Sequence, residues 1–127
     1  MRMIIIRNYN CSLGALTMPC FETEQAIRWG KAPDNPEILY GYLSRCEKFA
    51  ENAKQPEAVR LLERVIELLT DVICDTCVPR QWRCLCLDNL YRPLESLHRM
   101  AVSQEDRRRL NKKIYEINVL TRFFLTG

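Results

Sequence analysis

Hydrophobic and polar positions follow helical spacing along most of the chain, and the longest such pattern runs from residue 57 to residue 77. Charged side chains recur there every three or four residues, and apolar side chains fill the rest of the circumference. The charged positions are Arg60, Glu63, Arg64, Glu67 and Asp71. At least two other helices are needed to cover an apolar arc this wide. We therefore predict a central helix over 57–77, with its charged line exposed.

A second helix is predicted over 36–54. Pro36 suits the first turn of a helix, and either Asp34 or Asn35 can supply the N-terminal cap. Apolar residues recur with helical spacing between these bounds. The helix should end near residue 54, because the residue that precedes Pro56 disfavours the helical conformation.

The C-terminal half carries two more helical patterns, over 80–101 and 104–125. Pro93 falls in the middle of the first and removes one backbone hydrogen bond, which predicts a kink or a split. Ser103 stands three residues before Asp106 at the start of the second, in the spacing of a capping box. The last helix should therefore start beside Ser103.

The first 30 residues read differently. Residues 1–21 combine a β-branched run with turn-forming residues and predict an extended arm or a short β-hairpin. A short helix is predicted over 23–29, with Thr23 as its N-cap and Gly30 as its stop. Two strands alone are marginal in water, so this arm should dock on the helices or on another chain.

The predicted turns are only a few residues long, so consecutive helices should be antiparallel. The fold class that follows is mainly α: an antiparallel four-helix bundle-like domain with an N-terminal extended arm, in one domain over 1–127. No helical-repeat period was found. A chain of this length supports one core.

The net charge of +3 is distributed unevenly. Residues 1–78 hold 9 Lys and Arg against 11 Asp and Glu, and residues 79–127 hold 10 against 5. An acidic partner should therefore meet the C-terminal half. The apolar run near Met1 is too short for a signal peptide or a membrane span, which predicts an intracellular, cytoplasmic protein that binds no membrane.

Seven cysteines give the chain a cysteine-rich appearance. Cys74, Cys77, Cys84 and Cys86 are close enough in sequence to raise a structural zinc module as a third functional reading. Helical spacing does not bring all four to one side, and the second CxxC of common zinc modules is missing. We expect reduced, structural cysteines, with no metal site and no cofactor, and keep zinc and disulfide pairing as alternatives.

The densest basic run comprises Arg107, Arg108, Arg109, Lys112 and Lys113. On a helix these residues form a basic face that binds polyanions, and Arg92 and Arg99 can extend it. In the simpler reading, Glu105 and Asp106 pair with Arg108 and Arg109 on a solvated surface. A nucleic-acid-binding regulator is therefore the alternative function, although helix-turn-helix, zinc-finger and RNA-recognition signatures are missing.

The last predicted helix carries two apolar stripes. The first contains Leu110, Ile114, Ile117, Leu120 and Phe124. The second contains Tyr115, Val119 and Phe123 and continues the face that began as basic. Either the N-terminal arm covers the second stripe, or it binds a partner protein or a second copy of the chain in a homodimer.

Sequence features of catalysis are few. His98 is the sole histidine, and we expect it to be partly buried in packing. The acids of 57–77 should be exposed, where their pKa values are not tuned for acid–base chemistry. The leading prediction is a non-enzymatic protein–protein interaction module, such as an adaptor, small chaperone or regulator, that presents a helical apolar surface.

Overall fold

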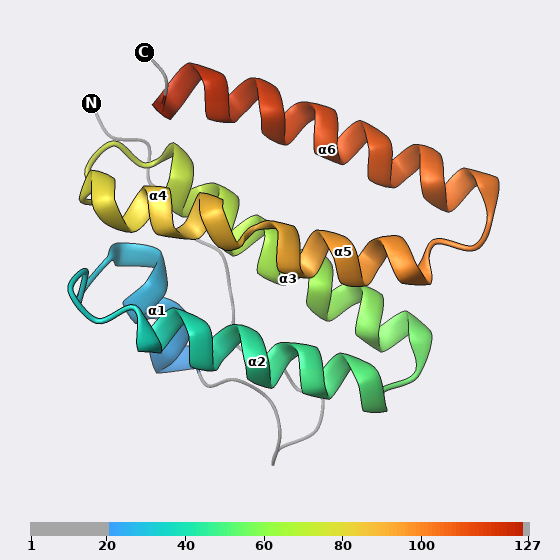
Figure 1. Cartoon of the computed structure of the whole chain (residues 1–127). Helices are drawn as coiled ribbons and strands as arrows, with labels where there is room; N and C mark the ends of the chain where they lie inside the picture. Colours follow the sequence, from blue (N-terminus) through green and yellow to red (C-terminus); the bar gives the residue numbers. More distant parts are fainter. Residues whose placement is uncertain (1–20, 126–127) are drawn as a thin grey trace.

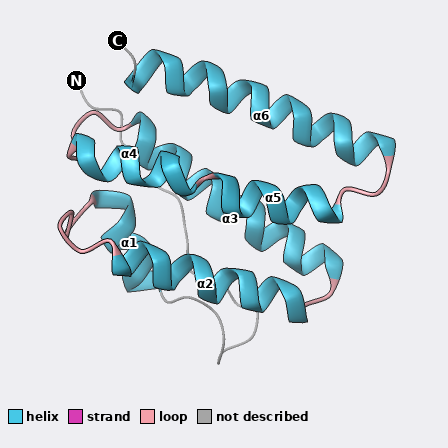
Figure 2. Ribbon diagram, viewed as in Figure 1, coloured by secondary structure: helices cyan, strands magenta, loops and turns pink. Residues whose placement is uncertain are grey.

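A computed structural model describes residues 21–125 of the chain. It contains six helices in this range and no strand (Figure 2). They are α1 (Phe21–Trp29), α2 (Glu37–Asn52), α3 (Gln55–Cys74), α4 (Arg80–Asn89), α5 (Tyr91–Met100) and α6 (Gln104–Leu125). The prediction of a mainly helical fold with packed helices is confirmed. The arm or hairpin predicted over 1–21 lies outside the described residues, except that Phe21 begins α1.

The centre of the fold is α3, which packs against α1, α2, α4, α5 and α6 (Figure 1). Its apolar side chains from residue 61 to 73 are at most 1% exposed. They are Leu61, Leu62, Val65, Ile66, Leu68, Leu69, Val72 and Ile73. The prediction of a central helix is confirmed, because burial on this scale requires several neighbouring helices.

The prediction that the charged line of α3 is exposed is wrong at one end. Glu67 is exposed, but Asp71 is only 9% exposed. The reason is that α1 contacts this line: Glu24 of α1 pairs with Arg64 of α3, and Arg28 of α1 pairs with Asp75 just after α3. Asp71 lies in sequence between Arg64 and Asp75, the two residues that α1 contacts.

Two predicted caps are wrong. The residue before α2 is Pro36, which makes no side-chain capping bond, and Asp34 instead accepts a hydrogen bond from Gln81 at 3.0 Å. Thr23 lies inside α1, which begins two residues earlier. The start of α3 also differs from the prediction, because Pro56 stands in its first turn rather than before it.

Gly30 ends α1, as predicted. Its φ is +59°, in the left-handed region that favours glycine. Its N–H donates to the carbonyl of Ile27 at 3.2 Å, and the N–H of Lys31 donates to the carbonyl of Ala26 at 3.0 Å. This pair of bonds is a Schellman motif. A Cβ at residue 30 would lie 2.9 Å from Cγ1 of Val78, so the packing also requires glycine.

The helix predicted over 80–101 is split, as Pro93 indicated. The break falls at Leu90, between α4 and α5. Pro93 has no N–H to donate to the carbonyl of Asn89, four residues earlier, so the ladder is interrupted there. The N–H of Leu90 instead donates to the carbonyl of Leu87 at 3.2 Å, which closes the last turn of α4 tightly.

The long helices reverse direction from one to the next, and α6 forms an outer layer beside α4 and α5 (Figure 1). Among residues 21–125, no helix combines the length and the hydropathy that a membrane crossing requires.

Candidate interaction surface on α6

The start of α6 is set by the predicted cap. The hydroxyl oxygen of Ser103 accepts a hydrogen bond from the N–H of Asp106 at 3.0 Å. Glu105 and Asp106 also place negative charge in the first turn, where the helix dipole favours it. The predicted cap at Ser103 is confirmed.

The buried stripe of α6 is narrow. Leu110, Ile117 and Leu125 are the apolar side chains of α6 that are less than 9% exposed. Ile114 and Phe124 are half-buried, and Leu120 is 38% exposed, so the first predicted stripe is only partly covered. A helix of 22 residues that buries so few positions leaves most of its circumference to solvent.

Main-chain contacts hold the C-terminal end of α6. Arg83 of α4 donates from Nη2 to the carbonyl of Phe124 at 3.0 Å, and Arg80 donates to the carbonyl of Leu125 at 2.6 Å. The Nε of Arg83 also donates to the carbonyl of Ile73 at 2.9 Å. Cations at helix C-termini satisfy unpaired carbonyls and the negative end of the dipole. One turn of α4 thus joins the ends of α3 and α6.

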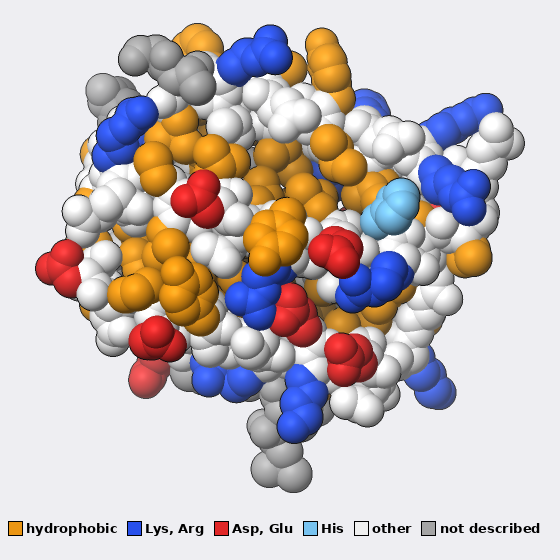
Figure 3. Space-filling model, in the orientation of Figure 1, with side chains coloured by type: hydrophobic (Ala, Val, Ile, Leu, Met, Phe, Trp, Pro, Cys, Tyr) orange, Lys and Arg blue, Asp and Glu red, His pale blue; other side chains and the backbone are white. Residues whose placement is uncertain are grey.

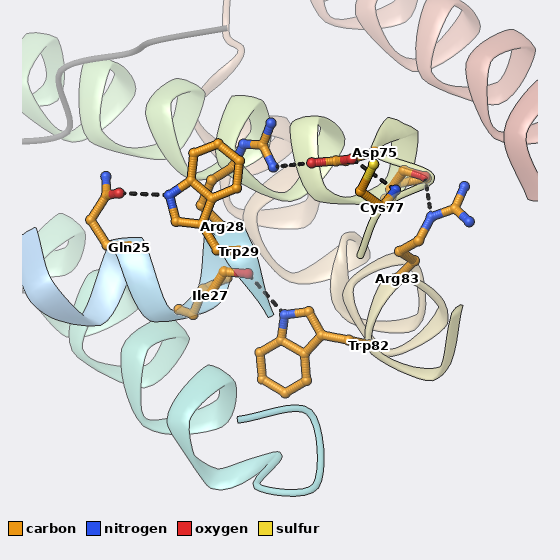
Figure 4. A network of polar contacts seen from close by, with 9 residues as sticks. Gln25, Ile27, Arg28, Trp29, Asp75, Cys77, Trp82 and Arg83 are labelled. Carbon is orange, nitrogen blue, oxygen red and sulfur yellow. Dashed lines mark hydrogen bonds and ion pairs between the residues drawn. The ribbon is translucent and has the colours of Figure 1, made fainter. Parts of the chain in front are cut away.

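The same turn of α4 holds α1. Trp82 donates from Nε1 to the carbonyl of Ile27 at 2.9 Å (Figure 4). Arg28 donates to the carboxylate of Asp75 at 2.8 Å and stacks 4.2 Å from the centre of the Trp29 ring. The other carboxylate oxygen of Asp75 accepts from the N–H of Cys77 at 2.9 Å. Most buried polar groups in this region are therefore matched with partners, and the exception is the Nε of Arg28, which is buried without a hydrogen-bond partner among the described residues.

The second predicted stripe is exposed. Tyr115 is 69%, Val119 50% and Phe123 76% exposed, on successive turns of α6. Figure 3 shows hydrophobic side chains on one face of the molecule, with acidic and basic side chains among them. Exposed large apolar residues on other elements, such as Tyr91 and Val102, do not form such a line. Whether residues 1–20 cover the stripe lies outside the described residues.

The residues of the basic run have three different environments. Arg107 donates from Nε to the carbonyl of Ala101 at 3.3 Å, back toward the end of α5. Arg109 lies 4.0 Å from the carboxylate of Glu63 on α3. Arg108 and Lys112 are exposed. With 3.6 residues per turn, these two lie on the same side of α6 as Val119.

The predicted extension of the basic face is wrong for Arg92 and stays a prediction for Arg99. Arg92 makes two hydrogen bonds to Glu47 of α2, at 2.6 and 3.0 Å, and these bonds raise its pKa. Arg99 pairs with Glu95 on the same helix at 3.1 Å. Both guanidinium groups therefore form ion pairs with nearby acidic side chains. The alternative pairing of Arg109 with an acid of its own helix is also replaced, since its partner is on α3.

A cleft of about 440 Å³ lies between the start of α3, the end of α5 and the first half of α6. Its apolar lining includes Val59, Leu97 and Leu110. Arg109 and Lys113 of the basic run line it, with Glu63 and Asp106. The charges of the lining thus balance. These two basic residues face a concavity rather than a continuous polyanion-binding surface.

The cysteines that raised the zinc alternative do not converge. Cys86 is fully buried and Cys77 is exposed, and Cys46, Cys74, Cys77, Cys84 and Cys86 are all free thiols. Burial raises the pKa of the Cys86 thiol to about 12, which opposes the thiolate that zinc needs. Over residues 21–125, no three His, Cys, Asp or Glu side chains lie together to hold a metal ion.

The prediction of a cysteine-rich chain is wrong. Seven cysteines in 127 residues are a smaller fraction of the residues than the about 8–10% that is typical of a disulfide scaffold.

A buried acid that sequence reasoning missed lies where α1, α2 and α3 meet. Glu24 is 1% exposed, accepts a hydrogen bond from the Tyr42 hydroxyl at 2.7 Å, and pairs with Arg64. Desolvation outweighs these contacts and raises the pKa of Glu24 to about 7. The network joins α1, α2 and α3, with Glu24 and Tyr42 at most 1% exposed. Its partners are 18 and 40 residues away in sequence, and no local pattern signals them.

His98 is exposed, so its predicted burial is wrong. The side chain falls on the outer side of α5, whereas Ser96 and Leu97 are buried.

No family model, curated protein or solved structure matches the chain.

Proposed function

We propose that this chain is a non-enzymatic protein–protein interaction module, an adaptor, small chaperone or regulator, that binds its partner through the outward side of α6. The observation that carries this proposal is the line formed by Tyr115, Val119 and Phe123, each at least half exposed. Aromatic side chains contribute large contact areas at interfaces, so their exposure on successive turns is costly without a partner. The wider proposal is one intracellular domain of the four-helix-bundle type with an N-terminal arm.

The test compares Phe123→Asp with Val102→Asp. Both substitutions place a carboxylate at an exposed apolar position, 76% and 73% exposed in the wild type, but only Phe123 belongs to the line. We expect Phe123→Asp to lose the partner retained by the wild type in pull-downs from the native host, while Val102→Asp keeps it. Size-exclusion chromatography with light scattering will show whether that partner is a second copy. Equal retention by all three proteins would show that the line is not the interface.

A nucleic-acid-binding regulator is the second candidate, and the exposure of Arg107, Arg108 and Lys112 favours it. Such binding weakens steeply with salt, because cations on the protein displace counterions from phosphates. We expect Arg108→Glu with Lys112→Glu to abolish retardation of an oligonucleotide at low salt. No retardation of the wild type would remove this candidate.

A further inference from the structure

The outward side of α6 carries one line of exposed residues, which is basic in its N-terminal half and apolar in its C-terminal half. Arg108 and Lys112 occupy its N-terminal half, and the three exposed apolar residues occupy its C-terminal half. At 100° per residue the five positions fall within about 80° of arc, and at 1.5 Å per residue they span about 22 Å. This is the length of about 15 residues of a facing helix.

The charge along this line favours an acidic partner. Near the line α6 exposes the cations Arg108, Lys112 and Arg122, and the acids Glu105 and Glu116. Glu116 and Arg122 lie on opposite flanks and offset each other. Glu105 lies one turn before Arg108, at the far end from the apolar residues. The half next to the apolar residues is therefore positive, and no ion pair among the described residues engages Arg108 or Lys112.

The area of the line argues against a second copy as its occupant. Aromatic side chains bury roughly 150–250 Å² each, so the exposed parts of Tyr115, Val119 and Phe123 amount to roughly 350 Å². A stable interface buries about 800 Å² on each partner, of which roughly 500 Å² is apolar in a homodimer. Parallel self-pairing would also place Arg108 opposite its own copy. A short helical segment needs a smaller area than a folded copy does.

We propose, resting on the function above, that the occupant is an acidic amphipathic helical segment of another protein. Its apolar residues, spaced by three and four, pack on Tyr115, Val119 and Phe123. Its acidic residues, at one end, meet Arg108 and Lys112. The apolar contacts supply affinity. The two cations fix the orientation of the bound helix and select an acidic partner over a basic one.

The test uses synthetic fluorescein-labelled helical peptides of 18 residues and fluorescence anisotropy against the whole chain. One peptide carries leucines at helical spacing followed by glutamates, the second replaces the glutamates by lysines, and the third scrambles the first. The protein variants are Phe123→Asp and the double variant Arg108→Glu with Lys112→Glu. The matched control is Arg45→Glu with Lys48→Glu, which makes the same charge change at two exposed positions of α2.

We expect the acidic peptide to bind the wild type at least tenfold more tightly than the lysine or the scrambled peptide. Reversing Arg108 and Lys112 should weaken it by about tenfold, as expected when two exposed attractions become repulsions. The α2 control should bind as the wild type does. Raising salt from 50 to 300 mM should weaken the acidic peptide more than the lysine peptide, because salt screens exposed charges.

Other results separate the two proposals. If acidic and lysine peptides bind equally and Phe123→Asp abolishes both, the acidic partner is wrong and the interaction surface stands. If Phe123→Asp changes neither peptide binding nor partner retention, both proposals are wrong. Equal binding of the scrambled peptide, displacement by a single-stranded oligonucleotide, or a wild-type dimer that Phe123→Asp dissociates would each overturn the acidic helix as the occupant.

Discussion

The buried acid Glu24 predicts how the stability of the fold depends on pH. Its pKa is about 7 in the folded chain and 4.5 in an exposed side chain. Between these values the folded chain binds more protons than the unfolded chain, so the free energy of unfolding falls as pH rises. The stabilising effect of the raised pKa is complete below pH 4.5 and is lost as pH rises through 7. The difference between the two pKa values corresponds to about 3 kcal/mol.

The assay is urea unfolding followed by circular dichroism from pH 4 to pH 8, on the wild type and on Glu24→Gln. The glutamine variant keeps the size of the side chain and removes its titration. We expect the wild type, relative to this variant, to lose about 3 kcal/mol of unfolding free energy between pH 4 and pH 8. Other titrating groups are common to both chains and cancel in the difference.

Glu22→Gln is the matched control, because Glu22 is exposed on the same helix. It should follow the wild type at every pH. If the difference between the wild type and Glu24→Gln is flat, or grows in favour of the wild type as pH rises, the reasoning is refuted. In that case the ion pair with Arg64 outweighs the desolvation of Glu24.

Three further substitutions test the packing by urea unfolding. Gly30→Ala should cost about 2 kcal/mol or more, because φ is +59° and the added Cβ would lie 2.9 Å from Val78; an unchanged midpoint would contradict the tight approach. Ser103→Ala should cost about 1 kcal/mol through the lost cap, and Ser103→Asp should restore it. Arg83→Met should cost about 3 kcal/mol, because two carbonyls lose a charged donor; a cost below 1 kcal/mol would show that water replaces it.

Features set by neighbouring residues were predictable from the sequence. The stop at Gly30, the cap at Ser103 and the break introduced by Pro93 each depend on backbone chemistry within a few residues. The central position of α3 followed from the width of its apolar arc. Helical spacing also placed Tyr115 and Phe123 on a second stripe of α6 and left open what covers it.

Features set by tertiary neighbours were not predictable. Asp34 is of a residue type that often caps helices, but its side chain accepts a hydrogen bond from Gln81, 47 residues away. The sequence predicts Arg92 as part of a basic surface, but its guanidinium group donates a hydrogen bond to Glu47 of α2. Asp71 continues an exposed line in sequence but is only 9% exposed in the fold, where α1 pairs with Arg64 and Asp75 on either side of it in sequence. In each case the periodicity is correct, and a long-range contact that periodicity does not encode decides the environment.

The bonds that hold the end of α6 have a consequence for sequence change. Arg80 and Arg83 bind carbonyl oxygens of the α6 main chain, not its side chains. The C-terminal end of α6 can therefore keep its place whatever residues occupy its outward positions, provided that they favour a helix. Mutation can diversify the outward line with little penalty in folding, so new binding specificities are accessible to selection on an unchanged scaffold.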